Sequence, residues 1–221
     1  MRGLLEKDFR LTLTRKQTIL IFFVMALVMS FSMDGSFTIG YLTMLSSIVA
    51  IGTLSYDEYD NGYAFLMTLP FDRKTYVLEK YLFSFLMTAG AWCVGVLLYF
   101  AGSFVSPGSG KAVGQLVGEL PMLLALIPVL YLSAAVMIPI RLKYGSEKSR
   151  TVLFIIFGII AVLIFGINNL PDGLANPFSQ LAQTLEGLSP AVILLTLFAV
   201  SAVLSGVSCL WSIRIMENKE F

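Results

Sequence analysis

The residue types that most often carry out chemistry in proteins are scarce in this sequence. The chain has no histidine, so it lacks the commonest general base at neutral pH and the commonest metal ligand. Cys93 and Cys209 both fall inside apolar runs, which favours two buried small side chains over a zinc site or a disulfide. We therefore expect no catalytic residue, no metal site and no cofactor site on this chain.

One short segment superficially resembles a phosphate-binding loop. The stretch GSGK at 108–111 contains the Gly-Lys pair of the pattern GxxxxGK[ST]. That pattern also requires Gly five residues before Gly110 and Ser or Thr directly after the Lys, but these positions hold Val105 and Ala112. We expect no nucleotide to bind here.

The apolar residues come in six long runs without a single charged residue. Charged residues make up 13% of the chain, against about 25% in a soluble domain. A helix of about 17–20 apolar residues crosses the hydrocarbon core of a membrane. The sequence therefore predicts an all-α, polytopic membrane protein whose residues 18–221 form one domain of six transmembrane helices, at about 18–33, 35–56, 81–105, 120–140, 151–168 and 188–213.

The absence of charge from these runs limits how the protein could use energy. Ion-driven transporters normally carry a titrating or coordinating group near the middle of the membrane. None of the 15 basic and 14 acidic residues lies inside a run. If the protein moves a substrate, we expect the energy to enter through another subunit.

The distribution of Lys and Arg predicts the orientation, because these residues are retained on the cytoplasmic side. With the N-terminus inside, 14 of the 15 basic residues fall on cytoplasmic segments and only Lys111 lies outside. We expect both termini in the cytoplasm. The net charge of +1 gives no support for nucleic-acid binding.

Residues 1–17 have a helical pattern of their own. An amphipathic, basic helix in this position lies along the membrane surface before the chain turns into the first span. We call this predicted element the elbow helix. Its apolar face carries Leu4, Leu5, Phe9 and Leu13, and its polar face carries Lys7, Arg10 and Thr14.

The cytoplasmic loop at 56–80 is the most informative segment. Its aromatic and apolar residues between 59 and 67 recur on one face of a short helix. The acids Asp57 and Glu58 suit the positive end of that helix, and Pro70 ends it. Asp72 can then cap a second helix that runs into the third span. Such a protruding aromatic edge suits docking into a groove of a partner.

Three segments together resemble the ABC-2 type transporter permeases, and most closely the small bacterial six-helix permeases that include the phenol-soluble-modulin exporter subunits. They are YDE at 56–58 with LPFDRKTYVLEKY at 69–81, RLKYGSEKSR at 141–150, and the amphipathic start. The resemblance implies a type V exporter-like architecture in the bacterial cell membrane, and a loop that couples to an ATP-binding-cassette ATPase. The coupling residues it implies are Asp57, Glu58, Tyr63, Leu69, Pro70, Arg73 and Lys74, with Tyr144 and Gly145 as a second contact.

The function implied is that of an exporter permease for a hydrophobic or amphipathic substrate, with peptides as the best candidate. ATP and magnesium would bind the partner ATPase, and two copies or two different permeases would form a dimer surrounded by membrane lipid. The alternative is a membrane scaffold or sensor that transports nothing and docks a cytoplasmic protein through the same loop.

Overall fold

The computed structural model of the 221-residue chain describes residues 1–32, 35–59, 62–66, 68–105, 113–168 and 189–219. Within these ranges, every regular element is a helix. The all-α prediction is therefore confirmed for the part of the chain that the structure describes. Lys111 lies outside the described residues, as do most residues of the segments 106–119 and 169–187, which connect the predicted spans on the outer side.

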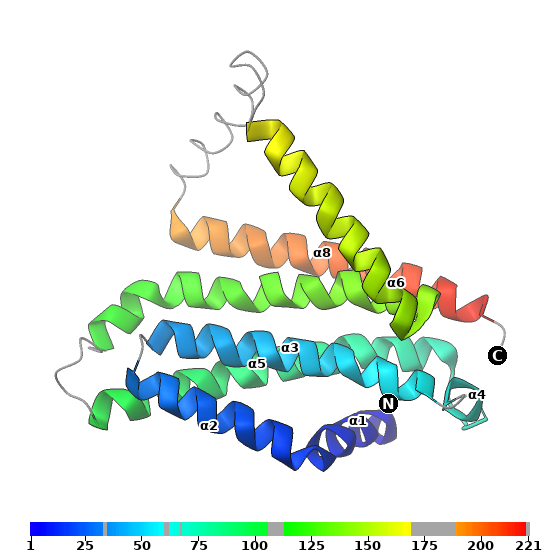
Figure 1. The fold of residues 1–221 in the computed structure, drawn as a ribbon, viewed down its shortest axis with the longest axis horizontal. Coiled ribbons are helices and arrows are strands. Elements are labelled where there is room, and N and C mark those ends of the chain that lie inside the picture. The colour runs from blue at the N-terminus through cyan, green and yellow to red at the C-terminus, as the bar shows by residue number, and fades with distance from the viewer. Residues whose placement is uncertain (33–34, 60–61, 67, 106–112, 169–188, 220–221) are drawn as a thin grey trace.

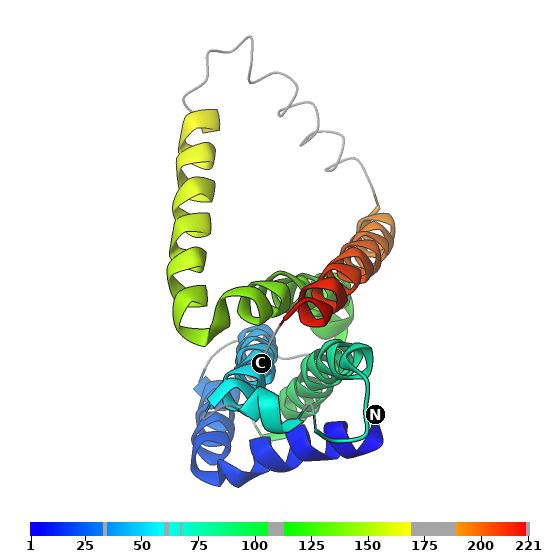
Figure 2. The same cartoon turned by 90° about the vertical axis from the view of Figure 1, so that its right-hand side faces the viewer.

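The helices form a bundle, and the N-terminal helix lies across one end of it (Figures 1 and 2). They are α1 (Arg2–Thr14), α2 (Lys16–Ser32), α3 (Gly35–Glu58), α4 (Gly62–Leu66), α5 (Arg73–Val105), α6 (Val113–Asn168) and α8 (Pro190–Glu217). The central helix α3 packs against α2, α5 and α6, and α8 packs against α5 and α6. Both chain termini and α4 lie at one end of the bundle, which we call the basal end (Figure 1).

Four helices are long and apolar enough to cross a membrane. These spans are Ser36–Glu58, Arg73–Ala101, Gly118–Ile156 and Pro190–Glu217. Helices α1 and α2 pass the same test only as a pair bent by 72°, so the described residues contain four or five candidate spans. The chain is a multi-pass helical membrane protein, but the predicted count of six spans is not confirmed.

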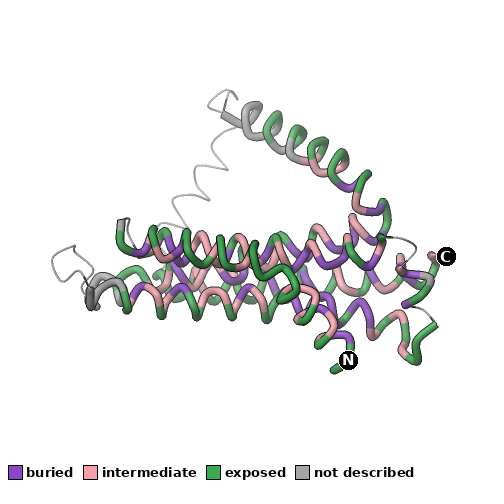
Figure 3. Tube along the Cα trace, turned by 60° about the horizontal axis from the view of Figure 1, so that its bottom comes forward, coloured by how far each residue is buried: buried purple, intermediate pink, exposed green. Residues whose placement is uncertain are grey.

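The predicted connection at 141–150, between the fourth and fifth spans, coincides with a kink in α6 but is wrong in extent, because the helical segments on both sides continue up to Gly145. Gly145, with φ 76° and ψ 172°, is the residue of this helix with non-helical backbone angles. Lys, Arg and Glu are good helix formers, so the charges that marked a loop in the sequence do not interrupt the helix. The part of α6 at 146–168 then leaves the bundle at an angle, with most of its described side chains exposed (Figures 2 and 3).

The predicted position of the loop acids is also wrong. Asp57 and Glu58 form the last residues of α3 rather than the start of the next helix, which begins at Gly62. Carboxylates at the negative end of a helix dipole are unfavourable unless cations or other donors offset them. The contacts described below supply such partners for both acids.

The larger part of the apolar core lies toward the basal end. Leu54, Tyr76, Ile138, Leu142 and Met216 belong to one buried cluster that joins α3, α5, α6 and α8. Toward the other end, α3 and α5 approach so closely that a Cβ atom on the glycine at 95 would lie 2.9 Å from a backbone atom of α3. The bundle is therefore packed along its length, and the basal end is where α4 joins it.

Candidate functional site

The basal end contains a buried cluster of charged side chains that joins three helices. Lys80, on α5, is 1% exposed and its ammonium lies 2.6 Å from a carboxylate oxygen of Asp57 on α3. The same ammonium donates to Asp8 of α1, which is fully buried. Lys7 donates to Asp57 at 2.5 Å, and the Tyr76 hydroxyl donates to the other oxygen of Asp57 at 2.9 Å. We call these five residues the ion cluster.

The ion cluster fixes the N-terminal helix to the bundle. Helix α1 buries the side chains of Leu4 and Asp8, which lie one turn apart and face α3 and α5. Buried carboxylates are tolerated only when they are paired with cations or hydrogen-bond donors. Because Lys80 pairs with acids from both α1 and α3, a displacement of one of these helices strains the other.

The short helix α4 docks through Tyr63, which is 5% exposed. The Tyr63 ring meets the Tyr76 ring edge to face, with 6.0 Å between centroids, and the ammonium of Lys219 lies 4.7 Å from its centroid. Burial raises the pKa of Tyr63 far above its ordinary value, so its ring stays neutral. Burial also lowers the pKa of Lys219, whose ammonium donates to the carbonyl of Leu142 at 3.0 Å.

The end of α3 also contacts the break in α6 at Gly145. The Glu58 carboxylate accepts hydrogen bonds from the backbone N–H and the hydroxyl of Ser146, both at 2.6 Å. The backbone angles of Gly145 belong to a region essentially reserved for glycine. A Cβ atom at this position would also collide with the Glu58 carboxylate. We call Glu58, Gly145 and Ser146 the hinge contact.

The start of α5 caps the end of α8. The Arg73 guanidinium donates to the carbonyls of Met216, Glu217 and Lys219 at 2.8–3.0 Å. A cation suits this position, because the last carbonyls of a helix carry its negative dipole end. Lys74 adds an exposed ion pair to Glu217 at 3.4 Å, which contributes little. The coupling loop is thereby joined to α8 as well as to α1, α3 and α6.

An exposed aromatic edge remains outside these contacts. Tyr59 is 81% exposed and Phe65, on α4, is 68% exposed. Beside Tyr59, an open cavity of about 480 Å³ lies between the end of α3 and the break in α6, and Tyr144 and Glu147 are among its lining residues. Exposed rings next to an open cavity form a surface that a partner can contact.

The predicted site residues thus fall into three groups. Asp57, Glu58, Tyr63 and Arg73 make internal contacts, and Gly145 provides the break in α6. The exposed group comprises Leu69, Pro70, Lys74 and Tyr144. The structure joins Glu58 to Gly145, two residues far apart in the sequence, whereas Leu69 and Pro70 lie between α4 and α5.

Sequence reasoning missed Asp8, Lys80 and Ser146. Lys80 was counted only among the basic residues that indicate the orientation, and it is one of the most deeply buried side chains. A signal for Asp8 was present, because on a helical wheel it falls between Leu4 and Phe9, inside the apolar stripe of α1. An acid in such a stripe indicates a buried cationic partner.

Among the described residues, no group of three or more His, Cys, Asp or Glu side chains is placed to hold a metal ion. The arrangement of paired charges, caps and aromatic contacts connects helices, and its exposed part is suited to contact another protein. Such a connected basal loop suits the membrane subunit of a transport system.

The comparison with protein families is consistent with this class. Residues 3–217 match the family described as ABC-2 family transporter protein, so the match covers nearly the whole chain. The chain belongs to this family, and the resemblance seen in the sequence is confirmed. It is a membrane component of an ABC transporter. No curated protein and no solved structure matches the chain.

Proposed function

We propose that this chain is the permease subunit of an ABC exporter and that a separate ATPase subunit, holding ATP and magnesium, docks on the exposed edge of loop 56–80. The observation that carries the proposal is the match to the ABC-2 family over residues 3–217. Members of this family normally work with an ATP-binding-cassette ATPase. The termini, α4 and the loop then face the cytoplasm, in agreement with the distribution of Lys and Arg.

The contacts at the basal end support a route for the coupling. A force on α4 acts on α5 through Tyr63 and Tyr76. Since α4 also contacts α3, the force reaches the end of α3, which is joined to the second part of α6 by the hinge contact. Arg73 carries the same displacement to the end of α8. Closely packed side chains transmit small shifts instead of absorbing them, because protein interiors have low compressibility. Internal residues such as Asp57 and Glu58 then transmit the motion, and exposed residues such as Phe65 make the contact.

The substrate we propose is hydrophobic or amphipathic, with peptides as the best candidate. A cavity of about 340 Å³ opens between α5, α6 and α8, and its lining includes Phe85, Tyr131, Phe198 and Ser205. Aromatic rings with a few hydroxyl groups suit an apolar side chain that carries a polar end. A second permease, identical or different, would complete the pathway, and six spans per chain would give the type V exporter-like arrangement.

The decisive experiment measures docking at the exposed edge. We expect Phe65→Glu to reduce co-purification of the ATPase, and its stimulated ATP hydrolysis, by roughly tenfold or more, because truncated aromatic anchors cost about 2 kcal/mol. Phe65→Tyr is the matched control, since it keeps the ring and should retain most of the binding. Both variants should insert in the membrane like the native chain, because Phe65 is exposed.

Two results would count against the proposal. Undiminished ATPase binding by a well-folded Phe65→Glu chain excludes docking on this edge. Recovery of a cytoplasmic partner that does not hydrolyse ATP, again lost in Phe65→Glu, favours the scaffold or sensor alternative over transport.

A further inference from the structure

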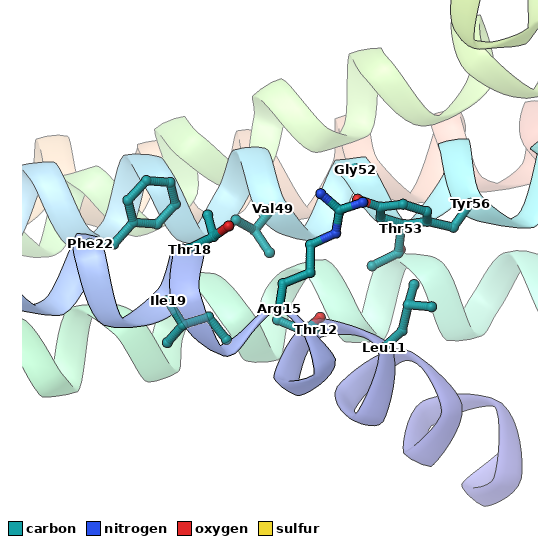
Figure 4. A pocket seen from close by; sticks show the side chains of 10 residues that line it. All are labelled: Leu11, Thr12, Arg15, Thr18, Ile19, Phe22, Val49, Gly52, Thr53 and Tyr56. Carbon is teal, nitrogen blue, oxygen red and sulfur yellow. The ribbon is translucent and has the colours of Figure 1, made fainter.

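A third cavity, separate from the exposed edge proposed to dock the ATPase, lies at the bend between α1 and α2. It has a volume of about 160 Å³ and opens between this bend and the outer face of α3 (Figure 4). We call it the elbow pocket. Its lining residues are Leu11, Thr12, Arg15, Thr18, Ile19, Phe22, Val49, Gly52, Thr53 and Tyr56.

The charge in the elbow pocket is unbalanced. The guanidinium of Arg15 lies 4.6 Å from the centroid of the Tyr56 ring, which holds it in place by a cation–π contact. No described residue forms an ion pair with Arg15, whereas two cations of α1 have such partners: Lys7 pairs with Asp8 and Asp57, and Arg10 with Glu6. A fixed guanidinium without a carboxylate partner is suited to bind a phosphate group.

The walls of the pocket are apolar on the side of the membrane. Ile19, Phe22 and Val49 line the part away from Arg15, and Figure 4 shows Phe22 and Ile19 following the arginine along α2. Leu20 and Ile21, between Ile19 and Phe22 on α2, are exposed and also apolar. A small soluble anion would satisfy the guanidinium but would leave these walls uncovered. An occupant with a phosphate and a hydrocarbon chain would both pair with the guanidinium and cover the apolar walls.

The level of the pocket in the bundle fits the boundary of a membrane. Tyr56 lies one turn or less from the end of α3, a candidate span, and tyrosine is enriched where spans meet water. Lys16, exposed and next to Arg15, adds a second positive charge to the same surface. Basic pockets beside transmembrane helices on the cytoplasmic side are known to hold anionic lipid head groups.

We propose that the elbow pocket binds the phosphate of an acidic glycerophospholipid, with Arg15 as its charged partner and the first acyl methylenes along Ile19 and Phe22. Bound lipid then fills the angle between α1 and α2 and holds the elbow in its bent form. The proposal does not depend on the identity of the transported substrate or on the ATPase, and it can be tested on the permease alone.

The test is a titration of the purified full-length chain with phosphatidylglycerol or phosphatidylcholine, followed by native mass spectrometry of the first bound lipid. We expect the native chain to prefer phosphatidylglycerol by about tenfold, which corresponds to about 1.4 kcal/mol. Arg15→Gln should abolish this preference. Arg10→Gln, an equal change of charge on α1 but outside the pocket, should change it less than twofold.

A second variant tests the shape of the site without altering charge. Gly52 lines the pocket, and a Cβ atom there would meet nothing within 4 Å. Gly52→Leu should therefore fill the pocket and remove the preference for phosphatidylglycerol. This variant tests the site if Arg15→Gln does not fold. Gly90→Leu on α5 is the matched control, since it also has open space and lies outside the pocket.

Three results would overturn the proposal. The first is equal binding of the two lipids by the native chain. The second is an equal loss in Arg10→Gln and Arg15→Gln, which would indicate general attraction of a basic surface for acidic lipid. The third is displacement of phosphatidylglycerol by millimolar inorganic phosphate or glycerol phosphate, which would identify a soluble phosphate group as the occupant.

Discussion

Replacing Lys80 by methionine is the sharpest test of the ion cluster. The change keeps the length of the side chain and removes the charge that pairs with Asp57 at 2.6 Å and with Asp8. Breaking a buried ion pair by removing one partner costs about 3–5 kcal/mol, because the remaining charge stays buried. Glu79, also buried and without a hydrogen-bond partner among the described residues, adds a third carboxylate that interacts with Lys80.

The measurement is the unfolding of the purified chain in detergent, followed by circular dichroism. For a chain of this length, a loss of about 3–5 kcal/mol lowers the unfolding midpoint by on the order of 10 °C. The control Lys74→Met removes an exposed ion pair and should cost less than about 1 kcal/mol. The double variant Lys80→Met with Asp8→Leu should regain most of the loss, because Asp57 keeps Lys7 and Tyr76 as partners.

Labelling gives a second measure of the same contact. Leu4 is buried beneath α1, so a cysteine at this position should react slowly in the native background and quickly in Lys80→Met. A cysteine at exposed Leu13 should react quickly in both. A stable Lys80→Met chain with a protected cysteine at position 4 would refute the inference that the ion cluster holds α1 in place.

Two further predictions concern the hinge contact and the orientation. Gly145→Ala should lower the free energy of unfolding by about 1–3 kcal/mol, because the backbone angles at this position suit only glycine. The control Gly158→Ala, on the same helix, should leave the free energy of unfolding nearly unchanged. Equal losses in the two variants would show that the break does not require glycine. In intact cells, a membrane-impermeant maleimide should label a cysteine at Lys111 but reach one at Tyr59 only after permeabilisation, and the opposite pattern would reverse the orientation.

The helical class and the family could be predicted because they depend on long uncharged runs and on local patterns. The bounds of the helices could not, because charges mark where a chain leaves the membrane and not where a helix ends. The segment 141–150 illustrates the difference: it contains Arg, Lys and Glu, all of which are compatible with a helix, and Gly145 alone interrupts it. The same holds for α3, which continues through Asp57 to Glu58.

The sequence predicted which segment contains the site, but it did not predict which residues elsewhere in the chain contact that segment. The loop residues Asp57 and Glu58 were taken as acids of a helix start that faces a partner protein, and the structure turns both toward this chain. Their partners Lys80 and Ser146 lie 23 and 88 residues away, and a single sequence carries no information on such pairings. Asp8 is the exception, since its place in an apolar stripe was visible without any partner.

The buried charges also bear on how the protein could use energy. Lys80 lies in the second or third turn of α5, yet acids of this chain neutralise its charge. Arg141 donates to the carbonyl of Ile51 at 3.0 Å and to the hydroxyl of Ser55 at 2.7 Å. A group that drives transport by binding an ion must exchange its partners with water during the cycle. These cations instead connect helices at one end of the bundle, where a force from outside the chain would act. Because α1, α3, α5, α6 and α8 all meet at this end (Figure 1), one docking event on the exposed edge would displace them together, and this is the input that we propose an ATPase subunit supplies.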